Sequence, residues 1–180
     1  MQTSQIPETP SVTKNDDAYL VKYLVMSSLC LFIGTVHGVL QVIRPIRAWL
    51  DSVGSPYGGP GHLIDPLAHA HINVVGGVVI FLMGASYYLL PKMSGVSLYS
   101  RRLVEHSFWW TSIGIAGFYS TLMIFGILEG QALLEDANQV DKIHHYYGPT
   151  IAVVSSVMGV GFWVYFANIF LTFRKIRKTP

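Results

Sequence analysis

The sequence is poor in residues on which many soluble enzymes and disulfide-stabilised domains depend. It contains one cysteine, Cys30, so no internal disulfide can form. Charged residues make up 12% of its 180 residues, about half the share found in an average soluble domain. It has no cysteine pair at zinc spacing, no glycine-rich phosphate loop and no serine nucleophile elbow. These absences argue against a zinc-binding domain, a nucleotide-binding enzyme and a serine hydrolase, and no nucleic acid is expected as a partner.

Hydrophobic residues, by contrast, make up 51% of the chain and gather in long runs. Four runs, near residues 19–43, 67–90, 107–128 and 148–172, reach the length of about 20 residues that a membrane-spanning helix needs. The sequence therefore predicts an all-α membrane protein whose four transmembrane helices form a bundle. We expect a loose polar tail over residues 1–18, a transmembrane domain over 19–173 and a basic tail over 174–180. The tail lacks the features of a cleaved signal peptide.

Lysine and arginine residues predict the orientation, because they concentrate on the cytoplasmic side of membrane proteins. The two ends of the chain and the second loop hold Lys14, Lys22, Lys92, Arg101, Arg102, Arg174, Lys175, Arg177 and Lys178. The first and third loops hold Arg44, Arg47 and Lys142. Both termini are therefore expected in the cytoplasm, and the protein is expected to be a multi-pass protein of the bacterial inner membrane.

Acidic residues are expected mainly on the outer face. The outer loops are predicted to carry Asp51, Asp65, Glu129, Glu135, Asp136 and Asp141. Such a surface could steer a basic redox partner by long-range attraction, or it could simply reflect the exclusion of lysines from that side. No carboxylate is expected deep within a span, which argues against a transporter with a midplane site.

Glycine and proline predict the helix boundaries and contacts. Pro91 is expected to end the second helix and Pro149 to lie in the first turn of the fourth. The glycine- and proline-rich residues 54–61 are expected to form turns over the outer face. Small residues within the spans suggest close helix packing or a flat cofactor; these are Gly76, Gly77, Gly114, Gly117, Gly159 and Gly161.

Six of the seven histidines lie at or near the outer edge of the hydrophobic runs. They are His37, His62, His69, His71, His144 and His145. His106 begins the third run at the opposite surface. Because imidazole is unfavourable among lipid tails, an intramembrane histidine suggests a functional site. The cluster predicts a metal or heme site near one membrane surface.

His37 and His71 are the preferred axial ligands of one heme b, although seven histidines would also permit two hemes. Their predicted depths are roughly 10 and 6 Å, at 1.5 Å per helical residue, and imidazoles from neighbouring helices suit the two faces of a porphyrin. His69 diverges from His71 by about 200° around a helix, so both cannot serve one metal atom unless the helix start is irregular. His69 would then face a loop, a propionate or a second centre.

Further candidates lie at the same edge. Arg44 and Arg47 follow the first helix, where they could pair with heme propionates or anchor the chain at the interface. His144 and His145 are the reserve ligands, and a solvated role beside the tyrosines that follow them is the alternative. His106, beside aromatic residues, is interpreted as an anchor at the inner surface.

Several segments resemble the catalytic subunit of heme-copper oxidases, most closely the nitric oxide reductases and C-family oxidases. His69–Gly77 and Phe81–Pro91 resemble its second helix, which opens with His-Thr-Asn and whose histidine ligates the low-spin heme. Here the triplet is His71-Ile72-Asn73, so the resemblance implies that His71 is a heme ligand. Weaker similarities involve Gly38–Gln41, Phe108–Ile115 with Tyr119, Gly126 and Gly130, and His144–Tyr147.

The departures from this family matter equally. Its catalytic subunit has about twelve helices, whereas this chain has room for four. The regions that supply the copper or iron ligands, the high-spin heme ligand and the second low-spin ligand have no counterpart. The resemblance therefore does not imply oxygen or nitric oxide reduction. It implies a truncated relative that retains one heme-binding helix.

The leading hypothesis is a b-type heme electron-transfer subunit of a larger respiratory or redox complex. It would move electrons between an outer-face partner, such as a periplasmic cytochrome c or redox enzyme, and a quinone or another membrane subunit. Two alternatives stay open. One is a catalytic copper or iron site built from His69, His144 and His145. The other is a heme-free structural accessory subunit.

Overall fold

The computed structural model describes residues 17–178, which form helices and connecting segments without a strand. Four helices in this range are long and apolar enough to cross a membrane: Ala18–Val42, Gly59–Ser94, Arg101–Glu135 and Ala137–Ile176. The predicted all-α fold with four spans is therefore confirmed. Nearly all of the predicted tail, residues 1–16, lies outside the described residues, as do the last two residues of the basic tail.

Each span is one helix or a series of helical segments. The elements, in chain order, are a 3₁₀ turn (Ala18–Leu20), α1 (Val21–Val42), α2 (Arg44–Ser52), α3 (Gly59–His62), a π-helical segment (Leu63–Ala68), α4 (His69–His71), a second π-helical segment (Ile72–Val79), α5 (Ile80–Ser94), α6 (Arg101–Glu135), a 3₁₀ turn (Ala137–Gln139) and α7 (Val140–Ile176). The second span is thus the least regular, and two π-helical segments flank the short α4 that carries His69 and His71.

A kink separates the first residues of the second span, 59–64, from its main part. Asp65 has an extended backbone, with φ −127° and ψ 111°. This conformation follows from Pro66, because a proline ring disfavours helical geometry in the residue before it. The predicted turn over residues 54–61 is correct only in part, since α3 already begins at Gly59.

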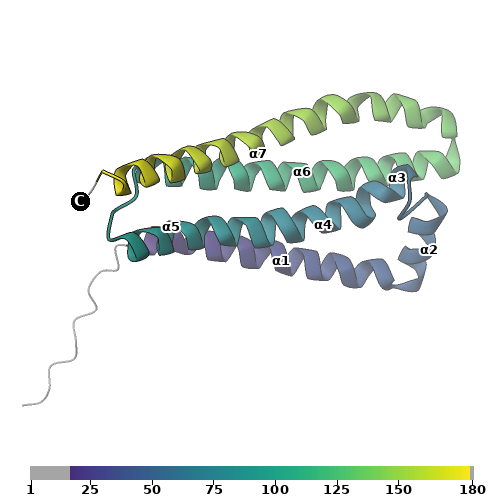
Figure 1. Cartoon of the computed structure of the whole chain (residues 1–180). Helices are drawn as coiled ribbons and strands as arrows, with labels where there is room; N and C mark the ends of the chain where they lie inside the picture. Colours follow the sequence, from purple (N-terminus) through teal and green to yellow (C-terminus); the bar gives the residue numbers. More distant parts are fainter. Residues whose placement is uncertain (1–16, 179–180) are drawn as a thin grey trace, which may run out of the picture.

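The spans pack as two neighbouring pairs (Figure 1). Helix α1 lies along the second span, and α6 lies along α7 over most of its length. The two pairs meet where α6 contacts α3, the π-helical segments Leu63–Ala68 and Ile72–Val79, and α5. Close approach of α1 depends on glycine, because a Cβ atom at Gly34 would lie 2.2 Å from Asn73 Oδ1. A Cβ atom at Gly38 would lie 2.8 Å from His69 Cε1.

The start of α1 and the end of α7 lie at the same end of the bundle (Figure 1). There the Arg101 guanidinium lies over the Tyr19 ring at 4.0 Å, and Lys175 Nζ donates to Ser97 O at 3.2 Å. Both described ends therefore share one side of the membrane. That this side is the cytoplasm stays a prediction.

A buried polar network connects three helices near this end. The Ser107 hydroxyl on α6 lies 3.0 Å from both the Tyr23 hydroxyl on α1 and the Tyr87 hydroxyl on α5. Tyr23 also donates to Val104 O at 2.8 Å. Since buried hydroxyls are costly to leave unpaired, the network fixes how the two helix pairs meet.

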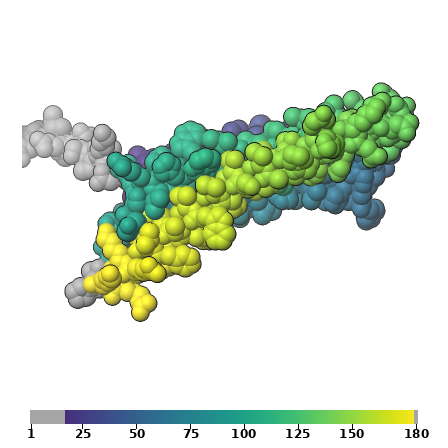
Figure 2. All heavy atoms as spheres, turned by 90° about the horizontal axis from the view of Figure 1, so that it is seen from above, coloured from purple at the N-terminus to yellow at the C-terminus, as the bar shows by residue number. Residues whose placement is uncertain are grey.

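Helix α7 is much less covered than the other spans. Only 6% of its most apolar 18-residue stretch is buried within the described residues, compared with 28–39% of the corresponding stretches in the other three spans. Figure 2 shows α7, in green to yellow, lying along the surface of the bundle. Its exposed side chains include Trp163 and Phe170. An apolar surface of this kind faces lipid or another membrane subunit.

The two prolines do not mark helix boundaries, contrary to expectation. Helix α5 continues past Pro91 to Ser94 and ends at Gly95, whose φ is 68°. Helix α7 begins at Val140, well before Pro149, so His144 and His145 lie inside it. Membrane helices tolerate proline because neighbouring groups satisfy the freed backbone carbonyl, whereas a left-handed glycine satisfies the last carbonyls of a helix.

Candidate functional site

His37 is the most deeply buried of the predicted ligands, with 6% of its surface exposed. Its ring centroid lies 5.4 Å from that of His69 and 5.8 Å from that of Tyr119. Its Nε2 atom is 3.0 Å from Gln41 Nε2, and its Nδ1 atom is 3.3 Å from the Tyr119 hydroxyl. Both ring nitrogens of His37 therefore have partners within this chain.

His71 has a different environment. Its Nδ1 atom lies 2.8 Å from Leu67 O, one helical turn earlier. A carbonyl can only accept, so Nδ1 carries the proton of the neutral ring and Nε2 is left as an acceptor. The ring packs against Phe118 with 4.7 Å between centroids. It borders a surface hollow of about 220 Å³ that is lined also by Ala70, Val74 and Val75.

His37 and His71 lie at the same level in the bundle, because they contact the adjacent residues Tyr119 and Phe118 of α6. The matched depth predicted from the sequence is therefore present. The two rings contact different partners, however, since His37 faces His69 while His71 faces Phe118. His69 and His71 diverge as helical geometry requires.

His144 lies much closer to the end of the bundle opposite the two termini. Its Nδ1 atom is 3.1 Å from Glu129 Oε1, and its side chain is 59% exposed. Glu129 lies eleven residues beyond Phe118 on α6, or roughly 16 Å at 1.5 Å per residue. His145 packs on Tyr146. The structure therefore separates His144 and His145 from the level of His69 and His71.

Within residues 17–178, no group of three or more histidine, cysteine, aspartate or glutamate side chains is placed to hold a metal ion. The set of His69, His144 and His145, on which the catalytic alternative depends, is not brought together. His62 contacts the backbone instead, with Nδ1 at 2.6 Å from Pro56 O. His106 is exposed.

Arg47 is the centre of an ion-pair network at the end of the bundle opposite the two termini. It donates to Asp51 Oδ1 at 2.8 Å, to Asp65 Oδ2 at 2.6 Å and to Ser55 Oγ at 2.8 Å. Hydrogen bonds to Asp51 and then Asp65 raise the pKa of Arg47 above its ordinary value. The network holds α2 against the kink of the second span. Arg44 is exposed, whereas the guanidinium of Arg47 is already bonded to Asp51, Asp65 and Ser55. Arg44 is therefore the better candidate of the two to pair with a heme propionate.

Glu129 was expected in an outer loop, and this expectation is wrong. It lies inside α6 and only 4% of its surface is exposed. The sequence did hold a signal for its burial, because Leu122, Gly126, Glu129 and Gly130 recur at the i, i+4, i+7, i+8 spacing of one helix face. Leu122, Gly126 and Gly130 are buried as well.

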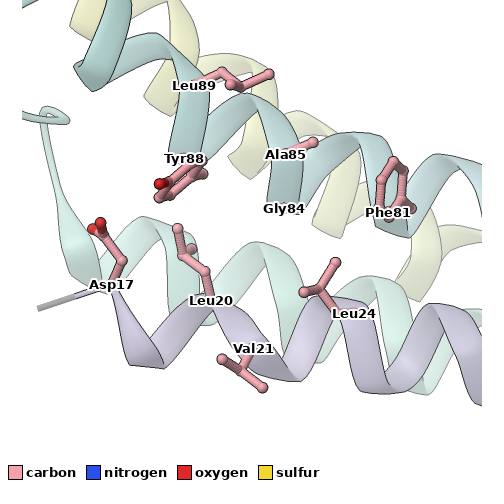
Figure 3. A pocket seen from close by; sticks show the side chains of 9 residues that line it. All are labelled: Asp17, Leu20, Val21, Leu24, Phe81, Gly84, Ala85, Tyr88 and Leu89. Carbon is pink, nitrogen blue, oxygen red and sulfur yellow. The ribbon is translucent and has the colours of Figure 1, made fainter. Parts of the chain in front are cut away.

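A separate hollow of about 350 Å³ lies between α1 and α5 (Figure 3). Its walls are apolar side chains such as Leu20, Leu24 and Phe81, with Asp17 and Tyr88 toward one end. Its lining contains no histidine. It therefore offers no imidazole ligand for a metal.

The four spans define a multi-pass membrane protein, in which His37 is buried and His69 and His71 are half-buried. Residues 66–155, half of the chain, match the family described as Cytochrome C and Quinol oxidase polypeptide I. The chain belongs to this family, which confirms the resemblance seen in the sequence. The matched region contains His69, His71, His144 and His145, whereas His37 lies outside it.

Three curated relatives are bacterial oxidase subunits. The Cbb3-type cytochrome c oxidase subunit CcoN1 of Stutzerimonas stutzeri is 26% identical over 62% of this chain and 22% of its own length. Cytochrome c oxidase subunit 1 of Rhodobacter capsulatus is 31% identical over 53% of the chain and 22% of its own length. A bacteroid homolog of cytochrome c oxidase subunit 1 from Bradyrhizobium diazoefficiens is 35% identical over 62% of this chain and 19% of its own length.

The chain thus spans about a fifth of the length of the curated relatives it matches. Together with the four spans, this relationship identifies it as a multi-pass protein of the bacterial inner membrane.

Proposed function

We propose that this chain is a heme-binding electron-transfer subunit of a larger membrane redox complex. The observation that carries the proposal is the orientation of His71. The bond from its Nδ1–H to Leu67 O, at 2.8 Å, fixes the ring and leaves the unprotonated Nε2 for a metal. His71 also occupies the histidine position of the His-Ile-Asn triplet within the matched residues.

The surroundings of His71 suit a flat apolar cofactor. Ala70, Val74 and Val75 give the adjoining hollow a smooth apolar wall, and Phe118 packs on the imidazole. A bound heme b, one per chain in the preferred form, would supply reversible one-electron chemistry. His71 would hold it, and the Leu67 carbonyl would keep the ring in the required tautomer.

The second axial ligand is proposed to come from another membrane subunit. The hollow beside His71 opens on the surface of the bundle, where Val74 is 54% exposed. His37 faces His69 and Tyr119 instead, with both nitrogens already hydrogen-bonded. His144 and His145 lie nearer the outer surface. A ligand from a partner would couple heme binding to assembly of the complex.

The electron partners follow from the two faces of the proposed subunit. The exposed carboxylates Asp51, Glu135, Asp136 and Asp141 gather at the outer end and suit a basic periplasmic cytochrome c or redox enzyme. The other partner would be a quinone in the lipid phase or a further subunit.

The test is a reduced-minus-oxidised spectrum, with heme quantification, of the complex purified from native membranes. We expect a b-type signal that is lost in His71→Ala. His37→Ala should keep most of the heme, because its side chain is not proposed as a ligand. His106→Ala, an exposed histidine at the opposite end, is the control and should keep all of it.

Retention of the full heme signal in His71→Ala, with normal assembly, would contradict the proposal. It would favour the heme-free accessory role instead. Loss of heme in His37→Ala but not in His71→Ala would assign ligation to α1.

A further inference from the structure

Two adjoining hollows form a groove between α1 and α6, and no role has yet been assigned to it. Each hollow is about 200 Å³, and His37, Leu40 and Met123 line both. One is bounded further by Phe32 and Tyr119 and the other by Trp49. The hollow bounded by Phe32 and Tyr119 lies in the spanning part of the chain, and Phe32 and Leu40 are exposed, so it is open to the lipid phase. The other hollow reaches α2, beyond the end of the first span.

The polar groups of this groove form a hydrogen-bonded series with a definite direction. The Gln41 amide nitrogen can only donate, so it donates to His37 Nε2 at 3.0 Å. The neutral ring then carries its proton on Nδ1 and donates to the Tyr119 hydroxyl oxygen at 3.3 Å. This assignment leaves the Tyr119 hydroxyl hydrogen available to an acceptor in the groove.

We propose that this groove binds the head group of a lipid-soluble quinone. A quinone ring is flat and apolar, and its carbonyl oxygen can accept a hydrogen bond from the Tyr119 hydroxyl group. Leu40 and Met123 would pack on the ring, and the isoprenoid tail would leave through the lipid-facing rim. A lipid acyl chain would fit the apolar walls but would leave the hydroxyl hydrogen unused.

The proposal deepens the proposed function and rests on it for the redox role of the bound quinone. Tyr119 and Phe118 are adjacent on α6, so the groove and the His71 site lie at one level in the bundle. They face different sides of that helix. A quinone at Tyr119 and a heme at His71 would therefore be near neighbours without sharing a ligand, and each site can be tested separately.

The experiment is photolabelling of the purified complex in quinone-free nanodiscs with an azido-quinone, followed by mass spectrometry of the peptides. We expect saturable adducts within residues 32–50 and 119–127 that an excess of unlabelled quinone removes. Tyr119→Phe removes only the hydroxyl group, and should weaken apparent affinity by about threefold to tenfold, the effect of one hydrogen bond. Tyr146→Phe, an exposed tyrosine on α7, is the matched control and should label as wild type.

Adducts elsewhere in the chain, or equal affinity in Tyr119→Phe and wild type, would overturn the proposal. Equal competition by an alkylbenzene of the same length would also overturn it, because the groove would then recognise hydrocarbon alone. Heme content is measured on the same samples. Loss of saturable labelling with a normal b-type spectrum refutes the quinone site, whereas normal labelling without heme refutes only the electron-transfer proposal.

Discussion

At the residue scale, histidines two positions apart on one helix have different surroundings, because a helix turns by about 100° per residue. His69 fits into the space that Gly38 leaves on α1, whereas His71 lies beside Phe118 on α6. Asn73 secures this arrangement, since its side chain donates to His69 O at 2.8 Å and packs on Gly34. The His71-Ile72-Asn73 triplet therefore contributes to helix packing through Asn73, in addition to the ligand role proposed for His71.

The first stability prediction concerns the buried carboxylate of Glu129. His144 Nδ1 lies 3.1 Å from Glu129 Oε1, so His144→Ala removes this partner of a buried acid and should lower the free energy of unfolding by about 1 kcal/mol. The double variant His144→Ala/Glu129→Gln should recover part of this loss, because a neutral amide is less costly to bury. Thermal unfolding in detergent measures both effects. His145→Ala is the control, and a larger loss in this variant would contradict the prediction.

At the element scale, α6 and α7 depend on small residues where their axes approach. A Cβ atom at Gly114 would lie 2.4 Å from the Met158 Cα atom, and one at Gly161 would lie 2.5 Å from the Thr111 backbone nitrogen. Backbone atoms cannot move aside as a flexible side chain can. The close approach of α6 and α7 therefore requires glycine at these two positions.

Gly114→Ala should separate α6 from α7 and destabilise the protein by about 1–3 kcal/mol, the usual effect of overpacking. Gly159→Ala is the matched control, because a Cβ atom there meets nothing within 4 Å. It should be neutral or slightly stabilising, since alanine favours helix over glycine. Melting temperatures of the two variants in the same detergent make the comparison. Equal melting temperatures would show that the contact does not limit stability.

Helix existence could be predicted from the sequence, whereas helix ends were predicted less well. Apolar runs are a local property, and they located all four spans. Pro91 and Pro149 were expected to lie at helix ends, because proline disfavours the interior of a helix in water. In a membrane an apolar helix continues through proline, since neighbouring groups satisfy the freed carbonyl. The kink at Asp65, by contrast, follows directly from the proline after it.

At the scale of the whole molecule, the orientation in the membrane is the feature most open to direct measurement. Ser97 lies in the connection between α5 and α6, and Ala137 lies between α6 and α7, so these positions are at opposite ends of the bundle. Both are exposed. The native Cys30 is buried within α1 and should give little background.

If both termini are cytoplasmic, a membrane-impermeant maleimide should label Ala137→Cys in spheroplasts without permeabilisation. Ser97→Cys should be labelled only after the membrane is opened. The unmodified chain serves as the control. The reverse labelling pattern would show that the lysine and arginine distribution has been misinterpreted and that the outer acidic residues face the cytoplasm.

The sequence by itself determined the four spans, the common depth of His37 and His71, and the divergence of His69 from His71. It also suggested the close contacts at five of six glycines, all except Gly159. Each of these follows from hydropathy or from the fixed geometry of a helix, which act over short stretches of chain. Only the tertiary structure decided which partner each polar group has. Tyr119 meets His37 across 82 positions of sequence, and Glu129 is buried against α7. Such pairings depend on which helix faces meet, and that is decided by packing of the whole bundle.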